Sequence, residues 1–256
     1  MRRRGWVAGM ALLAIGPSGN ARAAEPKADP RSKTAPAVAS SAAPATIPFQ
    51  LKKVDSHSAL VTLKLSIPVF DHPRPGARTA IATLVDRELE RFVKYGPAPG
   101  NQGSVELSCE VATATTSVIS FACRSMVLEG SIADHAKAIG GAPAERTVST
   151  LLLLIDGDDV RKGALDDLLA NPDRDEPAIL KKVQAALSGT CPKLRLLPGT
   201  PADVFTVGPD GVRFYFPMMA FALDNDFEAA CPREATLSRA SLTGLLRPGG
   251  VLDRLR

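Results

Sequence analysis

The stretch VELSCEVATATTSVISFACRSMVL, residues 105–128, decides the fold, because its side chains alternate as in two strands joined by a turn. A turn at 115–117 gives three cross-strand pairs: Cys109 with Cys123, Val111 with Phe121, and Thr113 with Ile119. In this register the apolar residues share one face of the hairpin. The other face is mostly polar or small, with Glu110, Ala112, Ser120 and Arg124. The stretch therefore predicts an antiparallel hairpin with two cysteines opposite each other.

Strand and helix patterns flank this hairpin on both sides. Upstream, residues 60–67 predict a strand that stops at Pro68, and an amphipathic helix follows up to Lys94. Downstream, the patterns predict a buried strand at 148–155, helices at 164–170 and 176–188, and short strands at 205–207, 212–216 and 235–237. Ser238 is expected to cap a closing helix that runs through Leu246. This mixture predicts an α+β fold, with helices packed on a largely antiparallel sheet, in two intimately joined halves at 48–160 and 161–256.

The N-terminus has the three parts of a secretory signal peptide. Arg2–Arg4 precede an apolar run at 5–16, and Ala21-Arg22-Ala23 forms a small-residue cleavage site. The apolar run is too short to span a bilayer. We therefore expect residues 1–23 to be removed and the protein to be periplasmic or secreted, with no transmembrane segment in the mature chain. Residues 24–47 are rich in Ala and Pro and predict a disordered tether.

The charge balance argues against a polyanionic partner. The chain has 31 Lys and Arg against 27 Asp and Glu, but four of the arginines lie in the signal peptide. Removing those four leaves 27 basic residues against 27 acidic ones. Since nucleic-acid binding needs a basic surface, we expect no nucleic-acid partner.

The four cysteines predict two disulfides. An even number of cysteines is typical of an exported protein stapled by disulfides. The hairpin register pairs Cys109 with Cys123, and Cys191 and Cys231 remain as a second pair that joins the end of a helix to the loop before the last strand. The alternative is a zinc site, which the wide spacing and the lack of a CxxC motif disfavour.

The sequence carries no motif for a known catalytic or cofactor site. It lacks GxSxG, SxxK, HExxH, GxGxxG and P-loop patterns. Each histidine does lie beside an aspartate, as Asp55 and His57, Asp71 and His72, and Asp134 and His135. An acid–base or metal site would need the fold to bring at least two of these pairs into one cleft. Because such pairs are common in loops, we expect no catalytic residue, no metal and no cofactor.

An aromatic and methionine cluster near residue 215 is the candidate for a partner-binding surface. Alternation of Phe214 and Phe216 predicts that these two rings lie in the core. Four neighbours are the candidates for an exposed patch: Tyr215, Met218, Met219 and Phe221. The alternative is that these residues too belong to the core.

Several short motifs together resemble a known family. They are IPVF at 67–70, GGAP at 140–143, DGDD at 156–159 with KGALDDLL at 162–169, FTV at 205–207, GVRFYF at 211–216, and the stretch from Ser241 to Pro248. This pattern resembles the extracytoplasmic domain pair of RsiV-type, lysozyme-sensing anti-sigma factors, which is also the accessory region of some secreted peptidoglycan deacetylases. A histidine that the family has in its GGAHP-like element is missing from the segment at 140–143.

The resemblance implies binding rather than catalysis. It suggests an exported module of the bacterial envelope that recognises a lysozyme-like protein or a peptidoglycan fragment. The alternative is an envelope hydrolase that acts on peptidoglycan or a related glycan through an Asp/His site. A third reading is a structural component whose ligand is another copy of itself.

Overall fold

The structure is a computed structural model of the 256-residue chain and describes residues 44–58, 61–94, 103–129, 146–217, 220–222 and 231–256. The predicted signal peptide and residues 24–43 of the predicted tether lie outside this part of the chain. The described residues form one compact unit. No helix of the described part is long and apolar enough to cross a membrane.

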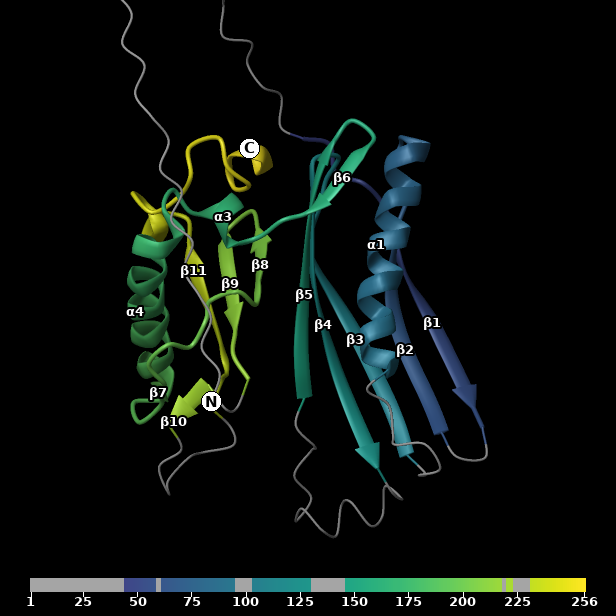
Figure 1. The fold of residues 1–256 in the computed structure, drawn as a ribbon, viewed down its shortest axis with the longest axis horizontal. Coiled ribbons are helices and arrows are strands. Elements are labelled where there is room, and N and C mark those ends of the chain that lie inside the picture. Colours follow the sequence, from purple (N-terminus) through teal and green to yellow (C-terminus); the bar gives the residue numbers. More distant parts are fainter. Residues whose placement is uncertain (1–43, 59–60, 95–102, 130–145, 218–219, 223–230) are drawn as a thin grey trace, which may run out of the picture. The chain divides into compact units, whose positions relative to one another are not determined.

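The larger sheet has six strands in chain order (Figure 1). They are β1 (Phe49–His57), β2 (Val61–Phe70), β3 (Gly103–Ala114), β4 (Val118–Glu129), β5 (Arg146–Asp156) and β6 (Asp159–Lys162). Neighbouring strands are antiparallel, except that β2 and β3 run parallel. A parallel pair needs a crossover, which helix α1 (Pro75–Lys94) provides.

The predicted hairpin is confirmed, with one change of register. Cys109 lies opposite Cys123 and Val111 lies opposite Phe121, but Thr113 lies opposite Ser120 instead of Ile119. The predicted Thr113–Ile119 pair is wrong because a β-bulge between Val111 and Thr113 inserts one extra residue into β3.

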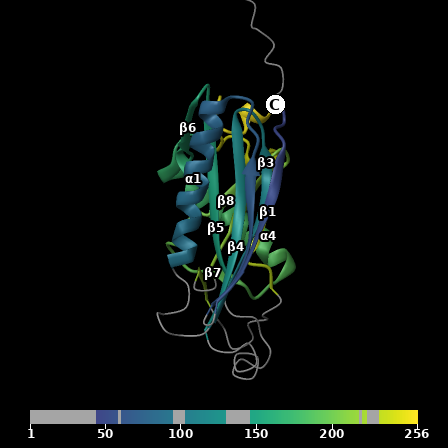
Figure 2. The same ribbon diagram turned by 90° about the vertical axis from the view of Figure 1, so that its right-hand side faces the viewer.

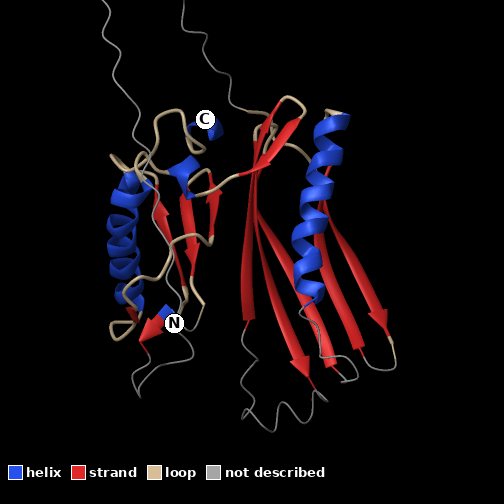
Figure 3. Cartoon of the chain, viewed as in Figure 1, coloured by secondary structure: helices blue, strands red, loops and turns tan. Residues whose placement is uncertain are grey.

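The smaller sheet is formed by the C-terminal part of the chain. It has three strands in the order β11 (Glu234–Ser238), β9 (Gly211–Tyr215) and β8 (Phe205–Gly208). Helix α4 (Pro172–Thr190) packs against β11, and the amide of Arg174 donates to the side chain of its N-cap, Asn171. The short helix α3 (Leu165–Leu168) and a two-stranded pair, β7 (Arg195–Leu196) with β10 (Phe221–Ala222), complete this part (Figure 3).

Both faces of the larger sheet take part in a hydrophobic core. Ala77, Ile81, Val85 and Leu89 of α1 pack against one face, in a cluster that includes Leu107, Phe121 and Leu153. Val118, Leu152 and Leu154 on the other face share a second cluster with α4 and the smaller sheet. The elements are therefore layered as α1, larger sheet, smaller sheet and α4, an order visible in Figures 1 and 2. This confirms an α+β fold with helices packed on a largely antiparallel sheet.

A strand that the sequence analysis did not predict, β1, begins just after the predicted tether. The last residues of that tether belong to the fold, since Thr46 bridges Thr115 and Ile47 is buried at 2% exposure. The amide of Ile47 donates to the carbonyl oxygen of Ala114 at 3.0 Å. The last residues of the predicted tether therefore belong to the folded part, because these backbone bonds hold the chain to the end of β3.

The predicted closing helix from Ser238 to Leu246 is wrong. Only one 3-10 turn forms, at Ala240–Leu242. The Ser238 hydroxyl does accept the amide of Ser241, at 3.2 Å, as a cap would. The helix does not continue because the backbone turns left-handed at Gly244, with φ of 82°.

Both predicted disulfides are formed. Cys109 and Cys123, the hairpin disulfide, join β3 to β4 with a Cα–Cα distance of 4.0 Å. Cys191 and Cys231, the loop disulfide, join the residue after α4 to the segment before β11. Disulfides of this kind are typical of proteins that fold in an oxidising compartment.

Candidate functional site

The predicted partner-binding patch near residue 215 is not a surface where the structure describes it. Tyr215 is 4% exposed and Phe221 is 2% exposed. The phenol oxygen of Tyr215 lies 3.2 Å from the hydroxyl oxygen of Thr206, so even its polar end has an internal partner. Tyr215 and Phe221 are therefore core residues, as Phe214 and Phe216 are. Met218 and Met219 lie outside the described residues.

Two of the three Asp/His pairs lie at opposite ends of the β1–β2 hairpin. His57 lies opposite Thr62 at the start of β2, whereas His72 follows Phe70 at its end. At about 3.3 Å per residue, the eight steps from Thr62 to Phe70 separate the two histidines by roughly 26 Å. These two pairs do not form one cleft. Asp134 and His135 lie outside the described residues.

His72 has a structural role. It is 2% exposed, and its Nδ1 accepts the amide of Arg74 at 3.2 Å. Its Nε2 lies 3.3 Å from the carbonyl oxygen of Thr116, which assigns the proton to Nε2 in a neutral ring. Both ring nitrogens are thus used to hold the chain between β2 and α1. His57, in contrast, is exposed and lies 3.0 Å from Asp55.

A shallow groove of about 330 Å³ lies over β1–β3 and is lined by three residues from each strand: Lys53, Val54, Asp55, Lys64, Leu65, Ser66, Glu106, Leu107 and Ser108. Leu65 and Leu107 belong to the core under α1, so the polar and charged residues next to them in the strands lie on the face of the larger sheet that α1 does not cover. Lys64 and Glu106 lie directly opposite each other in the register, with Nζ and Oε1 3.7 Å apart. The charges therefore alternate in sign along the cross-strand row of Asp55, Lys64 and Glu106.

The same face continues toward the smaller sheet, where a second hollow of about 260 Å³ lies between β3 and β9. Glu110 of β3 accepts from Arg124 at 3.2 Å and from Arg213 of β9 at 3.4 Å. Arg124 also donates to Glu234 of β11 at 2.6 Å. The charged chain Arg213–Glu110–Arg124–Glu234 thus ties the two sheets together.

Arg124 is the central charge of this chain. Its guanidinium carbon lies 5.7 Å from the ring centre of Tyr215, which makes a cation–π contact. Burial by itself lowers the pKa of Arg124, but the hydrogen bonds and charges of Glu234 and Glu110 outweigh burial and raise that pKa above its usual value. Arg124 therefore remains charged. We use the name sheet groove for the surface that carries Lys53, Asp55, Lys64, Glu106, Glu110, Arg124 and Arg213.

The charged side chains of the sheet groove are paired and partly exposed. Its carboxylates are matched by lysines or arginines across the strands, and its ion-paired side chains are between 31% and 63% exposed. Half-exposed pairs of this kind can exchange an internal partner for an external one. Within the described ranges, no three His, Cys, Asp or Glu side chains gather as metal ligands would.

The sequence contained a signal for this groove. Glu106, Ser108 and Glu110 alternate along the first strand of the quoted hairpin, and Arg124 lies on the same face of the second. The sequence gives no signal for Arg213, because Arg213 lies about a hundred residues after Glu110 in the chain. The docking of the smaller sheet brings Arg213 to Glu110.

Comparison with known proteins supports the fold. No family model and no curated protein matches the chain. A solved structure of a DUF3298 family member from Bacteroides fragilis matches with a TM-score of 0.53 and 10% identity, over 84% of this chain and 99% of that one. A DUF3298 family protein from Pseudomonas aeruginosa matches with a TM-score of 0.51 and 15% identity, over 79% and 95%. At these identities the likeness concerns architecture, and the chain has a DUF3298-like fold.

Proposed function

We propose that this chain is an exported, non-enzymatic binding module of the bacterial envelope, and that it recognises a protein or cell-wall partner through the sheet groove. The observation that carries this proposal is the groove itself, a row of matched charges on an open sheet face. The predicted signal peptide and the two disulfides support export to an oxidising compartment.

The fold supports the groove as a rigid binding surface. The hairpin disulfide joins the strands that carry Glu110 and Arg124, and its sulfurs lie on the opposite face of the same sheet. Buried Phe121 packs beside it, at 1% exposure. Because this support fixes the spacing of the charges before a partner arrives, binding costs little conformational entropy.

Matched charges also define the class of partner. A surface of alternating signs selects a partner with complementary charges at the same spacing, as on a folded protein or on the amino and carboxyl groups of a peptidoglycan stem. The resemblance to lysozyme-sensing proteins makes a lysozyme-like protein the first partner to test. We further propose that the chain is related to the extracytoplasmic domain pair of RsiV-type proteins and to the accessory region of secreted peptidoglycan deacetylases.

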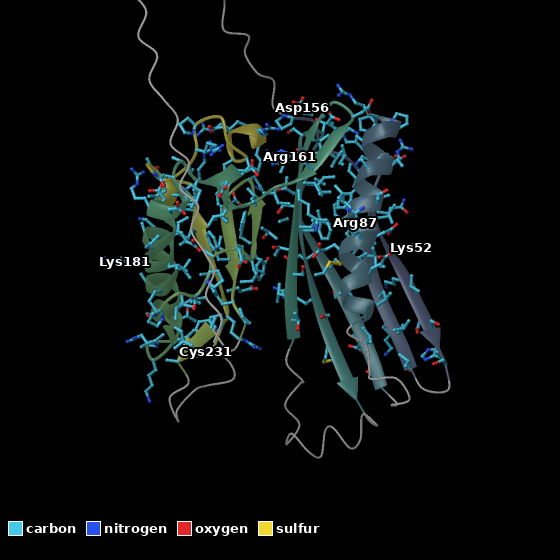
Figure 4. All side chains as sticks on the ribbon, viewed as in Figure 1. Lys52, Arg87, Asp156, Arg161, Lys181 and Cys231 are labelled. Carbon is cyan, nitrogen blue, oxygen red and sulfur yellow. A yellow bond between two sulfur atoms is a disulfide. The ribbon has the colours of Figure 1, made fainter. Side chains whose placement is uncertain are left out.

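The test is calorimetric titration of the exported, disulfide-intact chain with a c-type lysozyme and, separately, with soluble muropeptides. Arg213→Glu puts a like charge opposite Glu110, so it should weaken binding about tenfold, which corresponds to about 1.4 kcal/mol. Lys181→Glu on the exposed face of α4 makes the same change of charge outside the groove and should leave binding unchanged (Figure 4).

Three outcomes would contradict the proposal. They are binding of neither probe, binding that Arg213→Glu and Lys181→Glu affect equally, and turnover of the muropeptides. The patch predicted at Met218 and Met219 is tested in the same titration by replacing both residues with serine. If that variant alone loses binding, the partner surface lies there and not in the sheet groove.

A further inference from the structure

Strand β1 forms an outer edge of the larger sheet. Among the strands that the structure describes it pairs only with β2 (Figure 2), and eight of its nine residues are exposed. Phe49 and Leu51 on this strand are 42% and 45% exposed, and Val69, opposite Gln50, is 52% exposed. A long exposed edge with apolar side chains is the kind of surface on which another strand can pair.

The hydrogen bonds at both ends of the hairpin show which groups of β1 point outward. The amide of Asp71 donates to Pro48, and the amide of Ser58 donates to the carbonyl oxygen of Val61. Even-numbered residues of β1 therefore bond to β2, because antiparallel strands alternate hydrogen-bonded and non-bonded pairs. The amides and carbonyls of the odd-numbered residues, including Lys53 and Asp55, point away from the sheet.

The sequence of this edge is complementary to itself in an antiparallel register centred on Val54. When Val54 lies on a two-fold axis, Lys53 of each copy lies opposite Asp55 of the other, and both are outward-pointing residues. An axis at Lys52 or Lys53 would place two lysines opposite each other, and an axis at Asp55 would place two aspartates there. Like charges directly opposite each other destabilise a sheet, so these registers are disfavoured.

The charges of the neighbouring strands extend this match. Asp55 lies opposite Lys64, and Lys64 lies opposite Glu106, with Nζ and Oε1 3.7 Å apart. Adding Lys53 of a second copy beside Asp55 continues the row as Glu106, Lys64, Asp55 and Lys53, with signs that alternate across the joint. Helix α1 does not obstruct the joint, because its closest strand neighbours are β2, β5 and β6.

We infer that two copies of this chain pair through β1 in antiparallel register with Val54 at the two-fold axis. The two larger sheets then form one continuous sheet, and the two sheet grooves meet on the same face. This inference goes beyond the proposed function, since pairing of the chain with itself does not depend on what the groove binds.

Sedimentation of the exported, disulfide-intact chain over a concentration series tests the pairing. The wild type is expected to form a dimer, and Lys53→Asp or Asp55→Lys alone should raise the dissociation constant about tenfold or more, because each puts like charges opposite each other twice. An equimolar mixture of the two variants should regain the dimer, since every opposed pair is then again of opposite sign. Lys181→Asp, which changes the charge on α4, should behave as the wild type.

A monomer at every concentration would overturn the inference. So would a dimer that survives both single reversals, because its interface would then lie elsewhere. Recovery of the dimer only on mixing is the result that a general change in charge or folding could not produce.

Cross-linking provides a second test, of the register itself. Val54 would face its own copy in a non-hydrogen-bonded pair, where Cα atoms lie about 4.5 Å apart, close enough for a disulfide. Val54→Cys should therefore yield a covalent dimer under mild oxidation. Ser56→Cys is the matched control, because position 56 would lie opposite Lys52. Equal or better cross-linking through position 56 would refute the register.

Discussion

The docking of the smaller sheet on the larger one depends on two hydroxyl groups, and Ser120→Ala tests this directly. Ser120 lies on the face of β4 that α1 does not cover, and it is fully buried. Its hydroxyl oxygen accepts a hydrogen bond from the amide of Val207 at 2.9 Å. Thr150 of β5 accepts the amide of Phe205 in the same way, at 3.2 Å. These amides belong to β8, the edge strand of the smaller sheet. The larger sheet thus supplies side-chain acceptors where a further strand would otherwise pair.

The cost of Ser120→Ala arises because the buried amide of Val207 loses its hydrogen-bond acceptor. Val207 is fully buried, so water does not reach its amide to replace the lost acceptor. An unsatisfied buried donor costs about 1–3 kcal/mol in the free energy of unfolding. For a domain of this size that corresponds to a fall in melting temperature of roughly 2–12 °C.

Chemical denaturation of the disulfide-intact chain measures this cost. Ser108→Ala is the matched control, because Ser108 is an exposed serine on the same face of the neighbouring strand and should change stability by less than about 0.5 kcal/mol. A loss for Ser120→Ala as small as that of the control would refute the reasoning. Thr150→Val, which removes the second acceptor while keeping the shape, is expected to act in the same direction.

Three further predictions concern the charge, the disulfides and the turn of the smaller sheet. Hydrogen bonds from Arg161 lower the pKa of Asp167, so its carboxylate stabilises the fold above its unfolded pKa of about 3.9 and loses that effect as pH falls through the lower folded pKa. Asp167→Asn should therefore cost about 1–2 kcal/mol at pH 7 in urea titrations. That cost should shrink as pH falls through the lowered folded pKa of Asp167, and a pH-independent difference would contradict this. Replacing both cysteines of the loop disulfide by alanine should lower the free energy of unfolding by about 4 kcal/mol. The same change at the hairpin disulfide should lower it by about 3 kcal/mol, because the closed segments span 40 and 14 residues respectively. The reverse order in thermal unfolding would refute the loop-length argument. Gly211→Ala should destabilise the fold by more than about 2 kcal/mol, since a Cβ there lies 2.1 Å from the carbonyl oxygen of Leu237, and circular dichroism melting that matches the wild type would contradict it.

The candidate site shows where prediction from sequence succeeds. Glu110 and Arg124 were placed on one face of the hairpin by alternation alone, and they do form an ion pair there. The residues that complete the groove were not accessible in this way. Arg213 and Glu234 reach Glu110 and Arg124 only because the smaller sheet docks across β3 and β4.

The same distinction accounts for the positions of Tyr215 and of the Asp/His pairs. Tyr215 is a candidate for a surface patch in the sequence because it lies between Phe214 and Phe216, which are expected to face the core. The structure buries it as well, because β9 is the central strand of a sheet covered on both sides. The three Asp/His pairs looked equivalent in sequence. The hairpin places His57 and His72 at its two ends, and only the pairing of β1 with β2 reveals that separation.

The sequence by itself determined the local features: the hairpin at 105–128, the amphipathic helix, the pairing of Cys109 with Cys123, and the α+β character. These follow from side-chain periodicity and turn residues, which act over a few positions. The tertiary structure alone decided the bulge before Thr113, the burial of Ser120, the exposed edge of β1 and the joining of Arg213 to Glu110. Each of these depends on which distant segment covers a given face, and that is settled by packing across the whole chain rather than by any local pattern.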